Sequence, residues 1–422
     1  MKKFIVTIIA LVTILGLGYY TVNELYLSKK NKEIETDLRS SSKDKPSSSK
    51  EVKKPEFTTL KFVATGDALI HGAVYKDAKT DDGYDFRPQL KYVKPIIQSY
   101  DLAFYNQETV FAGEDYGFSG YPRFNSPKEV GDAMIDAGFN VVALANNHSI
   151  DKGEKGTLNS IAYWEDTEVM WHGYNKIENA DDIMIMTKND ITYAMLSYTS
   201  VNNIKPLNKT IRVNEYSYAQ AKKDVESIKD KVDVIIVSIH WGVEYSHTPS
   251  SFQIQAAKEL ASLGVHIICG HHPHVLQPIT RINDTLVIYS LGNFISAQRT
   301  TAQLTGALVG LEIKKDYKTN KITVSDPEVD LIYTIKNNRY RDFKLMPFTD
   351  INDSILPNSK KIYDDAYKVI TKMDENIKVK ELGSNLVSFN NDNSKNVAAV
   401  VVPHHDIVKN VKNEYWEILK KN

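Results

Sequence analysis

The stretch Val265-His266-Ile267-Ile268-Cys269-Gly270-His271-His272-Pro273-His274 joins an apolar run to three histidines within four positions. The run at 265–268 predicts a buried strand. Imidazole groups crowded at a strand end must be solvated, paired or bound to a metal, and neutral imidazole is the commonest protein ligand of transition metals. This stretch therefore predicts a strand that carries a metal site at its carboxyl end.

Five other apolar runs also end in polar side chains. The runs at 60–65, 102–105, 141–144, 234–239 and 286–289 are followed by Asp67, Glu108, Asn147 and His148, His240, and Asn293, respectively. Helical patterns lie between several of them, at 127–137, 218–229 and 251–263. Short strands that alternate with helices predict an α/β layered fold.

The position of these polar groups predicts a shared cleft, because sites in open α/β sheets form beyond the carboxyl ends of the strands. Taken alone, Asp67 is also typical of a turn. Glu108 could equally be a solvated carboxylate, and His240 a hydrogen-bonded histidine of the core. Asp151 fits either a helix cap or a partner that orients His148, three residues before it. Together, the six strand ends favour a site.

Composition limits the function classes and the ligands. The formal net charge of −1 argues against a nucleic-acid-binding protein, which normally presents a basic face. Cys269 is the single cysteine, so the chain has no internal disulfide and no thiolate cluster for a metal. The ligands must therefore be His, Asp, Glu or Asn side chains.

The first residues predict a membrane anchor at 1–27. Two lysines precede an uncharged apolar run at 4–22, which as a helix rising about 1.5 Å per residue nearly spans a hydrocarbon core of roughly 30 Å. A cleavable signal peptide is the alternative, but no small-residue cleavage site follows the run. Residues 28–56 contain a Ser- and Lys-rich tract and predict a flexible linker. We expect the N-terminus in the cytoplasm and the main domain outside the cell.

The motifs after the strands carry a family resemblance. Gly66-Asp67-Ala68-Leu69-Ile70-His71, Asn106-Gln107-Glu108-Thr109, Ala145-Asn146-Asn147-His148, His240-Trp241-Gly242-Val243-Glu244-Tyr245, Gly270-His271-His272-Pro273-His274 and Leu291-Gly292-Asn293-Phe294 resemble the bacterial CapA/PgsA capsule-synthesis family. The resemblance runs from about residue 60 to 296. It implies a metallophosphoesterase-like fold, a sandwich of two β-sheets flanked by helices, which we expect at 57–340. Residues 341–422 are expected to form a helical and loop extension.

The resemblance also implies the site residues. The expected metal ligands are Asp67, Glu108, Asn147, His240, His272 and His274, and the expected catalytic pair is His148 with Asp151. Further candidates are His71, His271 and Asn293, with His271 as the alternative to His272. Glu108 stands where metallophosphoesterases have a bridging aspartate, which leaves the usual two-metal geometry open. One or two divalent ions are expected, and mixed His, Asn and carboxylate ligands suit Mn, Fe or Zn.

The function implied by the resemblance is the synthesis and export of poly-γ-glutamate, a capsule polymer of the cell surface. The partners implied are a membrane-bound capsule ligase and small membrane subunits of the synthesis complex. Two classes of function stay open. The domain is either a metal-dependent enzyme acting on the polymer or a non-catalytic scaffold that retains the pocket for binding or folding.

Overall fold

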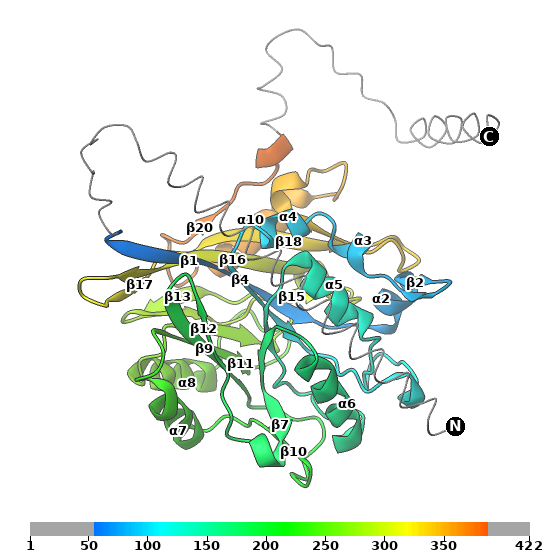
Figure 1. The fold of residues 1–422 in the computed structure, drawn as a ribbon. Coiled ribbons are helices and arrows are strands. Elements are labelled where there is room, and N and C mark those ends of the chain that lie inside the picture. Colours follow the sequence, from blue (N-terminus) through cyan, green and yellow to red (C-terminus); the bar gives the residue numbers. More distant parts are fainter. Residues whose placement is uncertain (1–54, 387–422) are drawn as a thin grey trace, which may run out of the picture. The chain divides into compact units, whose positions relative to one another are not determined.

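The computed structural model describes residues 55–386, which form one folded unit that begins at Glu56 (Figure 1). The expected anchor, residues 1–27, and nearly all of the expected linker, residues 28–56, lie outside the described residues. Within 55–386, no helix has both the length and the apolar composition needed to cross a membrane. The anchor therefore stays a prediction.

A ten-stranded mixed sheet forms one half of the unit. Its main order is β19-β18-β16-β1-β4-β5-β6, with β15 beside β1, β17 beside β16 and β20 beside β18. Strand β1 runs parallel to β4 and antiparallel to β16. The strands are β1 (Phe57–Ala68), β4 (Leu102–Gln107), β5 (Val141–Ala143), β6 (Met170–His172), β15 (Asn293–Ile295), β16 (Thr305–Asp316), β17 (Ile322–Val324), β18 (Glu328–Ile335), β19 (Lys344–Pro347) and β20 (Lys378–Val379).

A six-stranded mixed sheet forms the other half, in the order β13-β14-β12-β11-β9-β8. Strands β9, β11, β12 and β14 run parallel to one another. The strands are β8 (Ile185–Lys188), β9 (Ile191–Thr199), β11 (Val234–His240), β12 (Ile267–His271), β13 (Ile279–Ile282) and β14 (Thr285–Ile288). Two small antiparallel sheets pair β2 (Lys79–Thr80) with β3 (Gly83–Tyr84) and β7 (Tyr174–Lys176) with β10 (Ile211–Val213).

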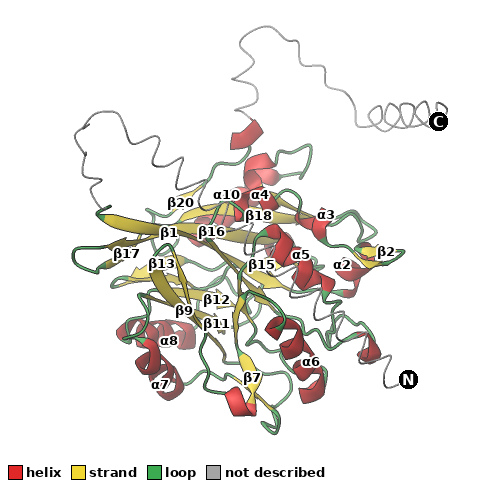
Figure 2. Ribbon diagram, viewed as in Figure 1, coloured by secondary structure: helices red, strands yellow, loops and turns green. Residues whose placement is uncertain are grey.

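Helices cover the outer faces of both sheets (Figure 2). Helix α8 begins with a capping box, in which Ser250 and Gln253 satisfy each other's backbone N–H groups. The helices are α2 (Gly72–Asp77), α3 (Arg87–Leu90), α4 (Lys94–Ile97), α5 (Glu129–Ala137), α6 (Gly153–Glu165), α7 (Tyr218–Ile228), α8 (Ser251–Ser262), α9 (Thr301–Leu304) and α10 (Ser359–Ile370), with 3₁₀ turns η1 (Glu114–Tyr116), η2 (Ile177–Asn179) and η3 (Phe348–Asp350).

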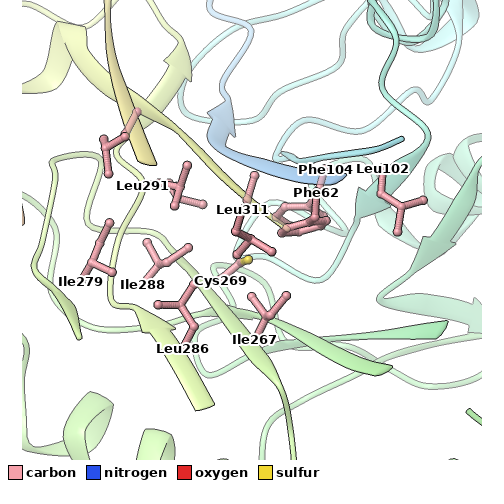
Figure 3. Packing of buried hydrophobic residues seen from close by; sticks show 14 of the residues in the cluster. Phe62, Leu102, Phe104, Ile267, Cys269, Ile279, Leu286, Ile288, Leu291 and Leu311 are labelled. Atoms are coloured by element: carbon pink, nitrogen blue, oxygen red, sulfur yellow. The ribbon is translucent and has the colours of Figure 1, made fainter. Parts of the chain in front are cut away.

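Alternating side chains on the central strands divide the core into layers. Phe62 of β1 and Cys269 of β12 lie in the same buried cluster between the sheets (Figure 3). Val63, the next residue of β1, packs with α5, and Ile268 of β12 packs with α7 and α8. Period-two alternation on strands buried on both faces produces this arrangement. The expected α/β fold, with two stacked sheets flanked by helices, is confirmed at this level.

The chain after residue 341 adds to the same unit. Strand β19 pairs with β18 in antiparallel register, and β20 pairs with the opposite end of β18. Ala366 and Ile370 of α10 are buried in the cluster between the sheets. The structure thus places residues 344–379 in the fold that the preceding strands form.

Candidate metal centre

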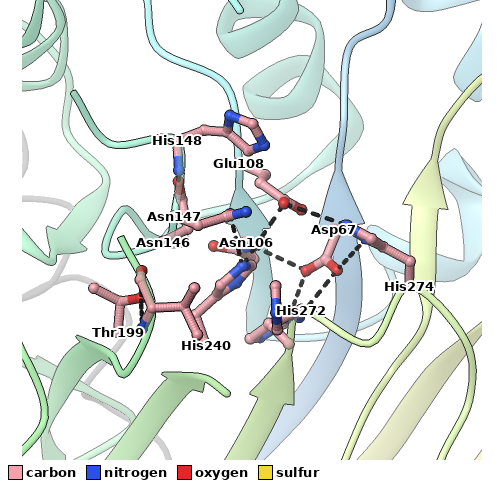
Figure 4. A network of polar contacts seen from close by, with 12 residues as sticks. Asp67, Asn106, Glu108, Asn146, Asn147, His148, Thr199, His240, His272 and His274 are labelled. Atoms are coloured by element: carbon pink, nitrogen blue, oxygen red, sulfur yellow. Dashed lines mark hydrogen bonds and ion pairs between the residues drawn. The ribbon is translucent and has the colours of Figure 1, made fainter. Parts of the chain in front are cut away.

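Carboxylates from one sheet and imidazoles from the other come together at the carboxyl ends of the strands. Asp67 near the end of β1 and Glu108 just after β4 supply carboxylates from the ten-stranded sheet, while His240 ends β11 and His271 ends β12 in the six-stranded sheet. All four side chains are buried. Figure 4 shows Asp67, Glu108 and His240 converging, as the polar ends of the predicted strands led us to expect.

Asp67 lies at the centre of the polar network. Its Oδ1 accepts hydrogen bonds from Asn106 Nδ2 at 2.9 Å and His271 Nδ1 at 3.0 Å, and its Oδ2 accepts from the backbone N–H of His272 at 3.3 Å. Burial alone would raise the pKa of Asp67, but the hydrogen bonds from His271 and His274 outweigh it and hold the pKa well below its ordinary value. Asp67 is therefore an anion fixed in place by its neighbours.

Glu108 has the opposite environment. Its carboxylate is fully buried, and within the described residues neither oxygen has a hydrogen-bond partner. The nearest ring nitrogens are His274 Nε2 at 3.6 Å and His240 Nε2 at 3.7 Å from Oε1, which is too far for a good hydrogen bond. Burial raises the pKa of Glu108 well above its ordinary value, against the opposing charge of His274. Such an unsatisfied carboxylate suits a bound cation.

Asn147 and His240 meet across the seam between the sheets. The Nε2 of His240 lies 3.0 Å from the amide Oδ1 of Asn147, while within the described residues its Nδ1 has no partner. Burial, followed by the nearby ring of His272, lowers the pKa of His240 well below its ordinary value. A neutral imidazole is the form that binds a metal.

The histidine cluster follows a distorted backbone. Gly270 approaches the neighbouring strand so closely that a Cβ there would lie 2.0 Å from the carbonyl oxygen of Tyr289. Beyond it, His272 and His274 have positive φ angles of 93° and 57°. A non-glycine residue with positive φ is uncommon and is held by its surroundings. This turn brings both His272 and His274 into the cluster, together with His271 at the strand end.

His274 contacts both carboxylates. Its Nδ1 lies 3.2 Å from Asp67 Oδ2 and 3.0 Å from the amide Oδ1 of Asn293. Although burial lowers it, Glu108 and Asp67 raise the pKa of His274 to about 9. In the same cluster, burial and His274 lower the pKa of His272 to about 4. The proton on His274 balances the buried negative charge, which a divalent cation would also do.

His148 and Asp151 form a separate pair beside this cluster. The Nδ1 of His148 lies 2.7 Å from Asp151 Oδ2, which also accepts the backbone N–H of Phe124 at 2.7 Å. The ring of Phe124 contacts the His148 ring edge-to-face, with centroids 4.7 Å apart. Asn203 Nδ2 lies 3.4 Å from the His148 ring nitrogens. Asp151 thus fixes the orientation of His148, which is one of the two roles that the sequence left open for it.

The three further candidates have different surroundings. His71 contacts the carbonyl of Leu69 through Nδ1 at 3.0 Å, and burial lowers its pKa to about 4. Asn293 orients His274, since its amide also donates to the carbonyl of Gln303 at 2.8 Å. His271 donates to Asp67, while its Nε2 has no partner within the described residues.

Two groups of ligand atoms fit a cation. Asp67, Glu108 and His240 offer three atoms within 4.8 Å of one another, and so do Glu244, His272 and His274. Buried polar atoms are almost always hydrogen-bonded, so the unpartnered oxygens of Glu108 and ring nitrogens of His240 and His272 call for an explanation. A divalent cation would satisfy the oxygens of Glu108, and Nε2 of His240, 3.7 Å from Glu108 Oε1, would be the imidazole nitrogen beside it.

Three residues of the site were not predicted. Asn106 donates to Asp67, Asn203 contacts His148, and Glu244 belongs to the second ligand group. Asn106 and Glu244 lie inside motifs that the sequence analysis quoted, so their proximity to candidate ligands was a usable signal. Asn203 lies in an irregular segment after β9, and no sequence signal marks it.

Sequence comparison places the chain among capsule proteins. The family model described as bacterial capsule synthesis protein PGA_cap matches residues 61–298. The PGA biosynthesis protein CapA of Bacillus subtilis (strain 168) is 30% identical over 241 residues, covering 54% of this chain and 61% of that protein. The capsule biosynthesis protein CapA of Bacillus anthracis is 29% identical over 281 residues, covering 62% and 66%, respectively. The chain thus matches a little under two thirds of the length of these relatives.

Among solved structures, a phosphatase from Mycoplasma pneumoniae aligns with a TM-score of 0.44 at 16% identity, covering 67% of this chain and 96% of that one. The 5′-nucleotidase of Candida albicans aligns with a TM-score of 0.37 at 14% identity, covering 78% and 55%. Such low scores carry no conclusion about function. The family match spans over half of the chain and includes the strand ends from Asp67 to Asn293. The protein therefore belongs to the bacterial capsule synthesis protein family.

Proposed function

We propose that this protein is a membrane-anchored component of poly-γ-glutamate capsule biosynthesis and export. In this proposal it carries a metallophosphoesterase-like, metal-dependent hydrolase or transferase site that faces outside the cell. The observation that supports a metal-dependent site most directly is the buried, unpartnered Glu108 carboxylate beside His240 and Asp67. The family match and the names of the two Bacillus relatives support the capsule setting.

Asp67, Glu108, Asn147, His240, His272 and His274 would hold one or two ions of Mn, Fe or Zn. When bound, such ions lower the pKa of a water ligand and polarise an acyl or phosphoryl oxygen. Mn and Zn both accept this mixture of imidazole and oxygen ligands, so the ligand set leaves the choice of metal to measurement.

His148 is the group suited to move a proton. Because Asp151 holds Nδ1, the ring keeps one orientation and leaves Nε2 as the nitrogen that accepts or returns a proton. Phe124 packs against the ring and limits the approach of water from that side. On a polyglutamyl chain this group would assist cleavage or transfer at an amide.

The proposed partners are the membrane-bound capsule ligase and the small membrane subunits of the synthesis complex, with poly-γ-glutamate as the polymer. The proposed orientation has the N-terminus in the cytoplasm and the folded unit outside. Protease treatment of intact cells tests this orientation, since external protease should digest the folded unit only if it is exposed. Protection until the cells are lysed would contradict it.

The catalytic part of the proposal is tested by His148→Ala in the full-length chain. It is expressed in a capsule-forming host that lacks its own copy, beside His247→Ala as a control. His247 contacts the carbonyl of Leu276 and belongs to neither ligand group. We expect His148→Ala to fold and to keep its metal content, with a lower melting temperature because the buried Asp151 carboxylate loses a partner, but to lose polymer formation or processing. Normal polymer from this variant would refute catalysis and favour the scaffold alternative.

A further inference from the structure

The two most exposed aromatic side chains among the described residues both lie beside the polar cluster. Tyr121 is 78% exposed and Tyr245 is 51% exposed. A single exposed apolar group needs no explanation, but exposed rings gathered beside a buried polar site suit contact with a ligand. Neither ring belongs to the metal ligands or to the proton-transfer pair proposed above, so their place at the site calls for a separate role.

Tyr245 is held on the His274 side of the cluster. Its ring centroid lies 6.2 Å from that of His274, and its hydroxyl accepts a hydrogen bond from Gln298 Nε2 at 3.5 Å. Its backbone N–H donates to the carbonyl of Pro273 at 2.7 Å, and its φ of 66° is one that a non-glycine residue adopts only where its surroundings hold it. The ring is therefore fixed in place, although about half of it faces solvent.

Tyr121 is held on the His148 side of the cluster. Its ring centroid lies 6.5 Å from that of Phe124, whose own centroid lies 4.7 Å from that of His148 and 5.4 Å from that of His71. The loop at 119–125 that carries both aromatic residues is closed by two backbone hydrogen bonds of 3.0 Å between its end residues. The loop that packs against His148 thus also positions Tyr121.

The two tyrosines belong to one rim of the cluster. His71, the last residue in the line of contacts from Tyr121, has its Nδ1 3.3 Å from the backbone N–H of Ala297. The next residue, Gln298, is the one that donates to the hydroxyl of Tyr245. The line of contacts therefore runs from one exposed ring to the other.

An exposed arginine accompanies each tyrosine on this rim. Arg123 lies two residues after Tyr121, and Arg299 follows Gln298. Within the described residues, neither guanidinium takes part in an ion pair or a hydrogen bond. A guanidinium group recognises carboxylates through two parallel hydrogen bonds. The rim thus combines flat aromatic surface with unpaired cations, and Tyr and Arg are the side chains that most often dominate binding energy at recognition surfaces.

We infer that Tyr121, Arg123, Tyr245 and Arg299 form a substrate-binding rim that holds an anionic polyamide chain across the metal cluster. The inference rests on the proposed function and names the features of the polymer that this chain recognises. The tyrosine rings pack on the methylene and planar amide groups of glutamyl units, and the arginines bind their free carboxylates. Tyr suits this task because its side chain has few rotatable bonds, so that ordering it costs little conformational entropy. The aromatic contacts give the specificity, since charge alone attracts any polyanion.

The alternative is an ordinary solvated surface, and the double variant Tyr121→Ala/Tyr245→Ala separates the two. Both side chains are largely exposed, so the variant should fold as the wild type does. The matched control is Tyr218→Ala/Tyr367→Ala, because these tyrosines are 43% and 39% exposed and lie on α7 and α10. Calorimetric titration of the full-length protein uses two probes. Poly-γ-glutamate is the first, and polyacrylate, a chain of carboxylates without amides, is the second.

We expect the wild type and the control to bind poly-γ-glutamate equally. Tyr121→Ala/Tyr245→Ala should bind it at least roughly tenfold more weakly, with its metal content and its affinity for polyacrylate unchanged. Arg123→Gln/Arg299→Gln should weaken the binding of both polymers and make it less sensitive to salt.

Wild-type affinity for poly-γ-glutamate in the tyrosine variant would overturn the inference and leave the proposed function in place. An equal loss of affinity for both polymers in that variant would also overturn it, because the rings would then not recognise the amide chain. No binding of poly-γ-glutamate by the wild type would overturn the inference together with the polymer named in the proposed function.

Discussion

Replacing Glu108 by Gln should stabilise the cation-free protein, although Glu108 is fully buried at the site. Both carboxylate oxygens lack a hydrogen-bond partner within the described residues, so folding removes this group from water without a replacement hydrogen bond, and the charge of His274 offsets only part of the cost of burial. Gln keeps the shape and is also an unsatisfied polar group, so the change removes only the additional cost of burying a charge, which we take as about 1–3 kcal/mol. We therefore expect Glu108→Gln to raise the free energy of unfolding by about that amount in the presence of a chelator.

The expected shift in melting temperature follows from the size of the folded unit. About 330 folded residues, at about 2.1 cal/mol/K each, give an unfolding entropy near 0.7 kcal/mol/K, so the melting temperature should rise by about 1–4 °C. The pKa of Glu108 is raised on folding, mainly by burial. The stability that Glu108 contributes is therefore full below its unfolded pKa and is lost as the pH rises through its folded pKa. The advantage of Glu108→Gln should consequently grow as the pH rises above about 4.5.

A divalent cation should reverse this order, because Glu108 then acts as a charged ligand and the wild type gains more from binding. Calorimetric melting of both proteins, in chelator and in Mn²⁺, at pH 5 and pH 7.5, gives the four comparisons required. Glu226→Gln controls for the loss of an exposed charge. The reasoning fails if Glu108→Gln melts below the wild type in chelator, or if Mn²⁺ stabilises both proteins equally.

Three further predictions use other parts of the structure. Asp67→Ala should lower the free energy of unfolding by about 3–5 kcal/mol even in chelator, because it leaves several buried donors unpaired. A smaller loss measured by urea unfolding would contradict the central role of this carboxylate. Asp151→Asn should lower polymer formation at least tenfold with the Mn²⁺ stoichiometry unchanged, and loss of metal would instead make Asp151 part of the ligand set. Burial raises the pKa of the Cys269 thiol, so an aromatic disulfide reagent at pH 8 should label it only after guanidinium unfolding, and rapid labelling of the native chain would be evidence against this packing.

The strand ends were predictable from the sequence because they combine a buried strand with a polar terminus. The run before Glu108 and the run before His240 correspond to β4 and β11, and both side chains reach the same cluster. The short strands β19 and β20 were not predicted, since segments of four and two residues carry too little periodic pattern to be recognised.

Which histidine of the cluster contacts which carboxylate could not be predicted from the sequence. Sequence spacing left His271 and His272 as alternatives, and the positive φ angles of His272 and His274 decide which side chains approach Glu244 and which approach Asp67. Backbone strain of this kind depends on tertiary packing, which spacing alone does not reveal. Glu244 was missed for a related reason, because an exposed glutamate in a loop is usually only solvated.

The distribution of charge between the sheets has a mechanical consequence. Asp67 and Glu108 come from one sheet, whereas His240 and the His271–His274 turn come from the other. A cation held by Asp67, Glu108 and His240 would link the two sheets, because its two carboxylates come from one sheet and its imidazole from the other. A shift of one sheet against the other would separate these ligand atoms, so a substitution in the shared core such as Cys269→Val, two residues before His271 on β12, should be detectable as a change in metal affinity. The affinity for the ion would then report on how the two sheets pack against each other.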